Sequence, residues 1–331
     1  MTEVSAAPPT FADITAAAAR LAGVAVTTPL LPCPALDAVT GATCLIKPEV
    51  LQVSGSFKFR GAYAKLSRLA DTARAQGIVA YSSGNHAQGV AAAAQILGAK
   101  ASIIMPADAP RIKIEKTKGY GAKVMPYDRY RQDREAVAKR LMEEEGALLV
   151  PPYDDPDIMA GQGTVGLEIA QQAADLGVSI DTALVCCGGG GLVSGSALAL
   201  AETSPKTQVY AVEPEGFDDT ARSLVSGERE RARDGAKSFC DALLAAQPGA
   251  ITWQANKRLL AGGLAVSDAE VAEAMRFAFR NLKLVVEPGG AVALAAALTG
   301  KLDLAGKTVA IVLSGGNVDP QLYCEVLSGT R

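Results

Sequence analysis

Lys58, in the stretch SGSFKFRGA, has the surroundings that are most informative about chemistry. Small polar residues precede it, and FKFRGAYAKLSRLA continues with helical character, which places this lysine in the first turn of a helix. The positive end of a helix dipole disfavours an ammonium ion, and a neutral lysine amine can add to a carbonyl group. The alternative is an ordinary surface lysine beside Arg60, and the local sequence alone favours that alternative.

A run of glycines follows the apolar segment TALVCC and precedes LVSGSALAL; it consists of Gly188, Gly189, Gly190 and Gly191. A strand, a glycine turn and a helix in this order direct backbone N–H groups and a helix N-terminus toward one point, where a phosphate can bind. The run is neither a Walker loop nor a strict GxGxxG motif. Glu213 stands where a dinucleotide-binding fold places its ribose-binding acid. An NAD-dependent oxidoreductase and a purely structural turn therefore remain open at this point.

His86 is the only histidine in the chain, so catalytic or metal centres that need two imidazoles are excluded. Acid–base chemistry then falls to carboxylates, tyrosine or a lysine with a lowered pKa. Glu213 and Asp219, with a main-chain carbonyl near Phe217, offer hard oxygen ligands of the kind that suit Mg, Mn or Ca. Acidic loops of this kind also cap helices, and a helix is expected to begin near Asp219.

These groups need elements to position them, and β-branched runs alternate with Ala-rich helical patterns along the chain. The predicted strands are GIVAYSS, ASIIMP, KVMPYD, ALLVPP, TALVCC, QVYAVEP and TVAIVLSGG. Such alternation predicts an α/β fold with parallel sheets. Capping-box patterns predict helices over about 11–22 and 268–282. SSGNHAQG and SGGN follow two of the strands and would face the cleft beyond the strand ends, unless they are simple turns.

The composition favours a soluble enzyme of two domains with a small-molecule partner. The chain has 331 residues and a net charge of -3, without a basic run that would bind nucleic acid or an anionic membrane. The uncharged stretch 182–201 is long enough to span a bilayer, but its glycine run would break a spanning helix. Six cysteines without CxxC spacing and an N-terminus without signal-peptide features predict a cytoplasmic protein. The charged stretch 218–241 is interpreted as a surface excursion.

An ordered set of motifs resembles the fold type II pyridoxal-phosphate (PLP) enzymes of the serine/threonine dehydratase and serine racemase group, which includes 3-hydroxyaspartate dehydratases. The motifs are SGSFKFRGA, SSGNHAQG, AGQGTVGLEI, CGGGGLVSG, VEPEGFDD, EPGGAVALAA and LSGGN. The resemblance covers about residues 20–317 and displaces the oxidoreductase interpretation. It implies a tryptophan synthase β-like α/β fold, with a larger PLP-binding domain from 1–76 and 151–331. Residues 77–150 would form a smaller domain that closes over the substrate.

The resemblance also implies a cofactor site. Lys58 matches the lysine that carries PLP as a Schiff base and moves the substrate's α-proton, and Phe57 matches the residue packed against the cofactor ring. The glycines 188–191 match the phosphate loop, and Asn85 matches the residue that hydrogen-bonds the phenolic oxygen. Ser314 matches the residue at the pyridine nitrogen, where a neutral hydroxyl suits elimination over transamination.

Residues on the substrate side match the family in the same way. The loop that binds the substrate α-carboxylate is matched by Ser82, Ser83, Gly84, Asn85 and His86. Ser83 also matches the opposite-face acid/base of serine racemases. Arg134 matches an arginine that can meet a dicarboxylate ligand, although a helix-surface arginine is the alternative. Glu213, Asp219 and the carbonyl of Phe217 match the divalent-cation site of racemase-like members.

The resemblance implies β-elimination from a β-hydroxy amino acid such as L-threonine, L-serine or 3-hydroxyaspartate, which gives a 2-oxo acid and ammonia. The alternative is a serine or aspartate-type racemase with side dehydratase activity. The expected cofactors are PLP and a divalent cation, and a homodimer is the expected assembly.

Overall fold

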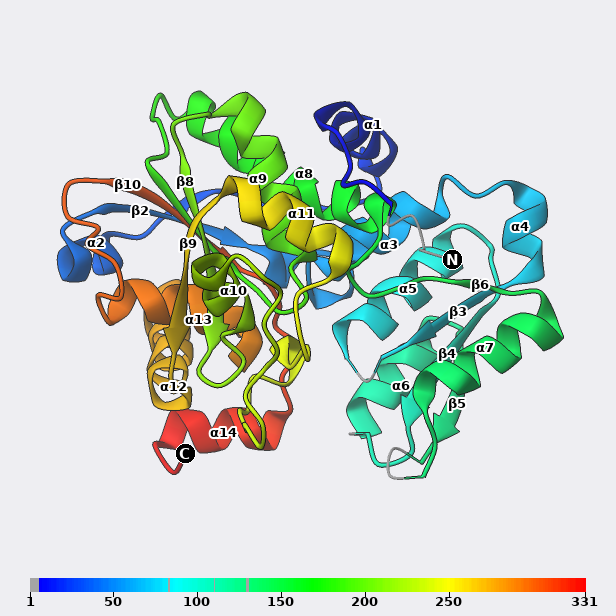
Figure 1. The fold of residues 1–331 in the computed structure, drawn as a ribbon. Helices are drawn as coiled ribbons and strands as arrows, with labels where there is room; N and C mark the ends of the chain where they lie inside the picture. Colours follow the sequence, from blue (N-terminus) through cyan, green and yellow to red (C-terminus); the bar gives the residue numbers. More distant parts are fainter. Residues whose placement is uncertain (1–5, 83, 110, 129–130) are drawn as a thin grey trace.

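Two sheets organise the chain, and Figure 1 shows them beside each other, each flanked by helices. The computed structural model describes residues 6–82, 84–109, 111–128 and 131–331. One sheet has six strands and the other has four, and we call them the large sheet and the small sheet. The predicted α/β class is confirmed.

The large sheet combines strands from both ends of the chain. In spatial order its strands are β1 (Leu31–Pro32), β2 (Thr43–Pro48), β10 (Thr308–Leu313), β7 (Thr182–Cys186), β8 (Gln208–Pro214) and β9 (Leu260–Val266). All neighbours pair in parallel except β1, which runs antiparallel to β2. Strands β1, β2 and β9 were not among the predicted strands. The sequence of β9, LAGGLAV, has two glycines and lies at the sheet edge, so it has little of the usual strand pattern.

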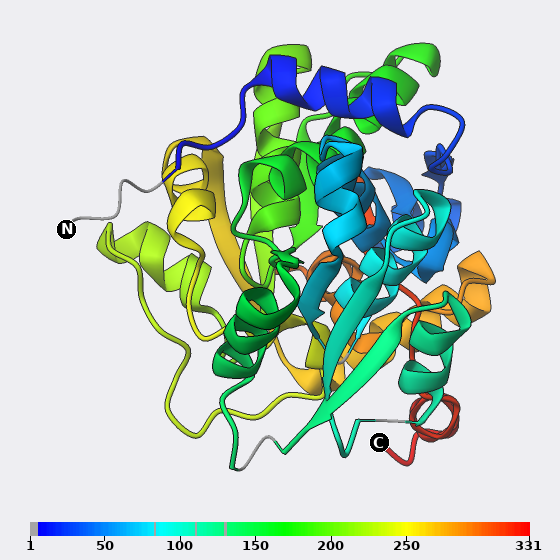
Figure 2. The same cartoon turned by 90° about the vertical axis from the view of Figure 1, so that its right-hand side faces the viewer.

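The small sheet is built from one continuous stretch of chain. Its strands, in spatial order, are β5 (Lys123–Tyr127), β4 (Ala101–Pro106), β3 (Ile78–Tyr81) and β6 (Leu148–Leu149), and all are parallel. Along β3, Ile78 and Ala80 join the core on the side of α5, while Val79 joins the core on the side of α7. Figure 2 shows this sheet from its own side of the molecule, with the rest of the chain behind it.

Most of the described helices lie outside the stretch 78–149. They are α1 (Phe11–Leu21), α2 (Pro34–Thr40), α3 (Lys58–Leu66), α4 (Asp71–Gln76), α8 (Pro156–Asp175), α9 (Gly191–Thr203), α10 (Asp219–Ser226), α11 (Ala250–Leu259), α12 (Asp268–Phe277), α13 (Pro288–Leu298) and α14 (Pro320–Ser328). Helices α5 (Asn85–Ile96), α6 (Arg111–Gly119) and α7 (Arg134–Glu145) flank the small sheet. Short helical turns are η1 (Glu49–Leu51), η2 (Val53–Gly55), η3 (Asp241–Leu243) and the π-helical η4 (Ala278–Leu282). Both predicted capping boxes are present, at the starts of α1 and α12.

The uncharged stretch 182–201 forms β7, the glycine turn and most of α9. Helix α9 packs closely on α8, because Gly195 brings its backbone against that of Met159 and Gly163. Within the described parts of the chain, no helix combines the length and the apolar character that crossing a membrane requires. All six cysteines are free thiols.

Candidate active site

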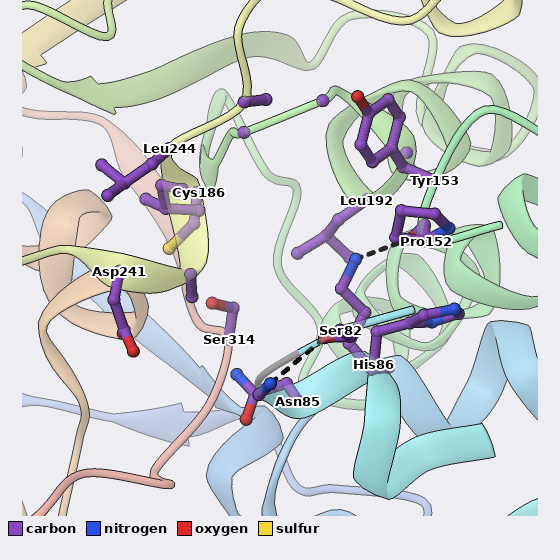
Figure 3. A pocket seen from close by; sticks show the side chains of 18 of the residues that line it. Ser82, Asn85, His86, Pro152, Tyr153, Cys186, Leu192, Asp241, Leu244 and Ser314 are labelled. Atoms are coloured by element: carbon purple, nitrogen blue, oxygen red, sulfur yellow. Dashed lines mark hydrogen bonds between the residues drawn. The ribbon is translucent and has the colours of Figure 1, made fainter. Parts of the chain in front are cut away.

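A cavity of about 430 Å³ lies where the carboxyl ends of β3, β7 and β10 face each other across the two sheets. This is the position at which parallel α/β sheets bind ligands. Figure 3 shows Asn85, His86, Ser314 and Tyr153 around it. The predicted residues that line it are Phe57, Lys58, Ser82, Gly84, Asn85, His86, Gly188, Gly189, Gly190, Gly191 and Ser314. Segments that are distant in the sequence therefore meet in one place.

Lys58 is the first residue of α3, as predicted. Its Nζ donates a hydrogen bond to the carbonyl oxygen of Pro152 at 2.7 Å and lies 5.1 Å from the centre of the Phe57 ring. Burial lowers the pKa of the Lys58 amine to about 8, while the carboxylate of Glu287 acts in the opposite direction. About a tenth of this amine is therefore neutral at pH 7.

The glycine loop connects β7 to α9, and its backbone has no room for side chains. Gly190 has a φ of 95°, and a Cβ there would lie 2.9 Å from the Thr252 hydroxyl. A Cβ on Gly189 would enter the ring of Tyr153. Helix α9 begins at Gly191, so its N-terminal N–H groups border the same cavity. Such a bare backbone at a helix start suits an anionic group such as phosphate.

The loop after β3 supplies the wall opposite the glycine loop. The main-chain N–H of Gly84 donates to Ser82 Oγ at 3.1 Å. His86 Nε2 lies 2.8 Å from the carbonyl oxygen of Val150, so this nitrogen carries the proton. Burial, with the charge of Lys58 nearby, lowers the pKa of His86 to about 3, and the ring is neutral. Ser83 lies outside the described residues.

Ser314 follows β10 and is buried. Its main-chain carbonyl accepts a hydrogen bond from the N–H of Phe57 at 3.1 Å, which ties the end of β10 to the start of α3. Ser314 and Asn85 both line the cavity, and Figure 3 shows their two side chains one below the other. The two predicted ring-contacting residues thus border one space.

The predicted cation ligands lie at the end of β8 and do not line this cavity. The carboxylate of Glu213 accepts hydrogen bonds from the N–H groups of Thr220 and Ala221 at 3.0 and 2.8 Å, so it caps α10. Asp219 is buried, and its Oδ2 has no hydrogen-bond partner in the described structure. Burial raises the pKa of Glu213 to about 8 and that of Asp219 to about 7. In the described residues, no group of three or more His, Cys, Asp or Glu side chains could hold a metal.

Two further predictions concern Arg134 and the charged stretch 218–241. Helix α7 begins at Arg134, whose side chain lies outside what the structure describes. The interpretation of 218–241 as a surface excursion was partly wrong, since Asp241 and the residues up to 247 return to line the cavity. Sequence reasoning also missed Lys113, Tyr153 and Glu287 as lining residues. Glu287 stands in the quoted motif EPGGAVALAA, so its place before a helix was an available signal.

The fold and the cavity together place a bare glycine loop at a helix start beside a lysine of lowered pKa, in an α/β protein. The sequence model of the pyridoxal-phosphate dependent enzymes matches residues 21–315. The chain belongs to this family, and the predicted family is confirmed.

Known relatives extend along nearly the whole chain. An L-threo-3-hydroxyaspartate ammonia-lyase from a Pseudomonas species is 44% identical over 96% of this chain and 98% of the relative. A serine racemase from Schizosaccharomyces pombe is 42% identical over 97% of this chain and 98% of the relative. Among solved structures, a threonine deaminase of T.th. superposes with a TM-score of 0.89 at 43% identity, covering 94% of this chain and 99% of that one. Maize serine racemase gives a TM-score of 0.90 at 36% identity, over 97% and 98%. These neighbours confirm the fold type II assignment and support the predicted class of β-elimination enzymes.

Proposed function

We propose that this chain is a PLP-dependent ammonia-lyase that converts a β-hydroxy amino acid to a 2-oxo acid and ammonia. L-threonine, L-serine and 3-hydroxyaspartate are the candidate substrates. One observation carries the proposal: the amine of Lys58, the glycine loop and the described residues of the loop after β3, Ser82 and 84–86, border a single cavity. The names of the relatives, which include hydroxyaspartate and threonine ammonia-lyases, support it.

The residues around the cavity fit PLP. The glycines 188–191 would hold its phosphate, because their backbone is bare and begins a helix. Asn85 and Ser314 would contact the ring at its phenolic oxygen and its nitrogen, and Phe57 would pack against the ring. When bound, PLP supplies a conjugated ring that stabilises negative charge at the substrate Cα. The neutral hydroxyl of Ser314 keeps this effect moderate, which suits elimination.

The chain's own residues would move the protons. Lys58 is neutral often enough, with a pKa of about 8, to take the α-proton of a bound amino acid. His86 stays neutral and fixed to the carbonyl of Val150, so it would orient the substrate loop rather than donate a proton. Ser82, Ser83, Gly84 and Asn85 would bind the α-carboxylate through hydroxyl and N–H groups.

The substrate side chain would be selected by a residue at the start of α7, which flanks the small sheet. Arg134 would meet the second carboxylate of 3-hydroxyaspartate through its guanidinium group. The amino-acid racemase activity is the second candidate, because a serine racemase is among the relatives at 42% identity and Ser83 matches its opposite-face acid/base. Both activities would begin with removal of the same α-proton.

A divalent cation, Mg, Mn or Ca, would bind Glu213, Asp219 and the carbonyl of Phe217. The unpartnered Oδ2 of buried Asp219 fits this role. We also propose that residues 77–150 form the smaller, closing domain and residues 1–76 and 151–331 the larger one. A homodimer in the cytoplasm completes the proposal, and the six free thiols are consistent with a reducing compartment.

A substrate panel tests the proposal. Purified protein with PLP is given L- and D-serine, L-threonine and the diastereomers of 3-hydroxyaspartate, with and without Mg. Release of 2-oxo acid and ammonia, together with inversion of configuration, is measured. Oxo-acid release from at least one β-hydroxy amino acid supports a lyase. Inversion without oxo-acid release supports the racemase, and protein that stays colourless with PLP overturns both.

A further inference from the structure

Four side chains form a continuous row of hydrogen bonds from the surface of α6 to the cavity. Lys116 Nζ donates to Asn317 Oδ1 at 3.2 Å. Asn317 Nδ2 donates to Asn85 Oδ1 at 2.9 Å, and Asn85 Nδ2 donates to Glu287 Oε1. The row alternates between the two halves of the molecule, since Lys116 and Asn85 flank the small sheet while Asn317 and Glu287 belong to the large one.

The residues at the two ends of the row, Lys116 and Glu287, determine which groups donate and which accept along it. A lysine ammonium can only donate hydrogen bonds. Burial raises the pKa of Glu287 to about 7, and its Oε1 accepts from Asn85 either as a carboxylate oxygen or as the carbonyl oxygen of the protonated acid. The amides of Asn317 and Asn85 can do both, so their orientation follows from the ends. A second hydrogen bond fixes the orientation of the Asn317 amide independently of Lys116, because Asn317 Nδ2 also donates to the carbonyl oxygen of Ser54 at 2.8 Å.

A flipped Asn85 amide would face like groups on both sides. Its oxygen would meet the carboxylate of Glu287, and its NH₂ group would meet the NH₂ group of Asn317. Asn85, Asn317 and Glu287 are all buried, and water cannot readily relieve such mismatches. The Asn85 side chain therefore lines the cavity as a hydrogen-bond donor, with one hydrogen of Nδ2 engaged by Glu287.

We propose that Glu287 and Asn317 are positioning residues that hold the Asn85 amide as a donor toward the phenolic oxygen of PLP. This inference rests on the proposed function, which gives Asn85 that contact. A phenolate oxygen only accepts hydrogen bonds, so a reversed amide would present an oxygen to an oxygen. Neither Glu287 nor Asn317 touches the reacting atoms in this scheme.

Reversing the row is the decisive experiment. In Asn317→Asp the residue that donated to Asn85 Oδ1 becomes an acceptor. Asn85 then has an acceptor on each side, and its oxygen has no donor whichever way the amide is turned. In the double variant Asn317→Asp with Glu287→Gln, the new glutamine can donate to Asn85 Oδ1, while the new carboxylate at position 317 accepts from Asn85 Nδ2. The double variant thus restores every bond of the row with the amide of Asn85 reversed. The bond to the Ser54 carbonyl is lost in both variants and cancels in their comparison.

Three quantities are measured on each variant: PLP affinity of the apo-protein, the absorption maximum of the bound cofactor and the thermal unfolding midpoint. Asn317→Asp should bind PLP about tenfold more weakly, as expected for one lost buried hydrogen bond, and should unfold at lower temperature. The double variant should unfold at a higher temperature than Asn317→Asp but keep the weak PLP binding and the shifted spectrum. The matched control is Asn281→Asp, which removes an exposed hydrogen bond to the Phe277 carbonyl far from the row and should bind PLP and absorb as the wild type does.

A double variant that binds PLP as tightly as the wild type overturns the inference, because a reversed Asn85 would then be harmless. If the variants do not fold, neutron diffraction of the wild-type holoenzyme answers the same question, and Asn85 Oδ1 facing Glu287 would contradict us. Wild-type protein that binds no PLP would instead refute the proposed function itself. The two failures are therefore distinguishable.

Discussion

Lys58 Nζ lies 2.7 Å from the main-chain carbonyl oxygen of Pro152, to which it donates a hydrogen bond. Lys58 begins α3, and Pro152 lies in the segment that leads from β6 of the small sheet to α8. The Lys58 amine is thus held where the two halves of the molecule meet. The same short segment contains Val150, whose carbonyl accepts from His86.

Attachment of PLP should depend on pH through the Lys58 amine. Burial lowers the pKa of this amine from 10.5 to about 8, so about a tenth of it is neutral at pH 7. The rate of covalent attachment to apo-protein, followed by stopped-flow absorbance, should rise with pH, reach half its maximum near pH 8 and level off above about pH 9. Lys58→Ala should show no attachment. A rate that keeps rising toward pH 10 would contradict the lowered pKa.

Lys113 and Asp241 form an ion pair at the cavity, and replacing one or the other should change KM in opposite directions. Both residues line the cavity, and a Cβ on Gly84 would lie 3.9 Å from Lys113 Nζ. If a substrate carboxylate binds Lys113 Nζ, Lys113→Met should raise KM by about tenfold. Asp241→Asn should lower KM, because the Asp241 carboxylate no longer competes with the substrate for this amine. Steady-state kinetics on the best substrate measure both. Changes of KM in the same direction would show that the pair acts only structurally.

Close packing of α8 on α9 predicts a stability effect at Gly195. A Cβ there would press on the carbonyl of Met159 and on the backbone of Gly163, neither of which can rotate away. Gly195→Ala should therefore lower the free energy of unfolding by about 1–3 kcal/mol, measured by urea denaturation. Gly119 is the matched control because a Cβ there meets nothing within 4 Å, and Gly119→Ala should cost nothing.

Arg60 and Glu49 form a buried ion pair under α3, and replacing only one of them should lower the free energy of unfolding. Arg60 Nε lies 2.7 Å from Glu49 Oε2, and both residues are fully buried. Arg60→Leu would leave Glu49 without its main counter-charge and should destabilise the fold by about 3–5 kcal/mol. Adding Glu49→Leu should recover part of the loss, in the same urea experiments. Arg140→Leu, which removes an exposed helix-surface pair with Glu144, should change little.

The sequence predicted the groups that lie next to strand ends and helix starts, because local patterns mark those positions. Lys58, the glycine loop and Ser314 are of this kind, and they line the cavity as expected. Asp241 could not be found in this way, because it reaches the cavity from an irregular segment whose path depends on tertiary packing. The partners of Asn85 were missed for a related reason, since Asn317 and Glu287 meet it only when the two sheets come together.

Strand β10 lies between β2 and β7, so one of the last segments of the chain joins the first part of the large sheet to its remainder. During synthesis on the ribosome, the small sheet is complete in the emerging chain long before β10 appears. The large sheet must wait, with the edges of β2 and β7 unpaired, until translation is almost finished. Unpaired strand edges of this kind are exposed to aggregation until β10 pairs with them, and truncation before β10 removes the strand that joins the two parts of the large sheet.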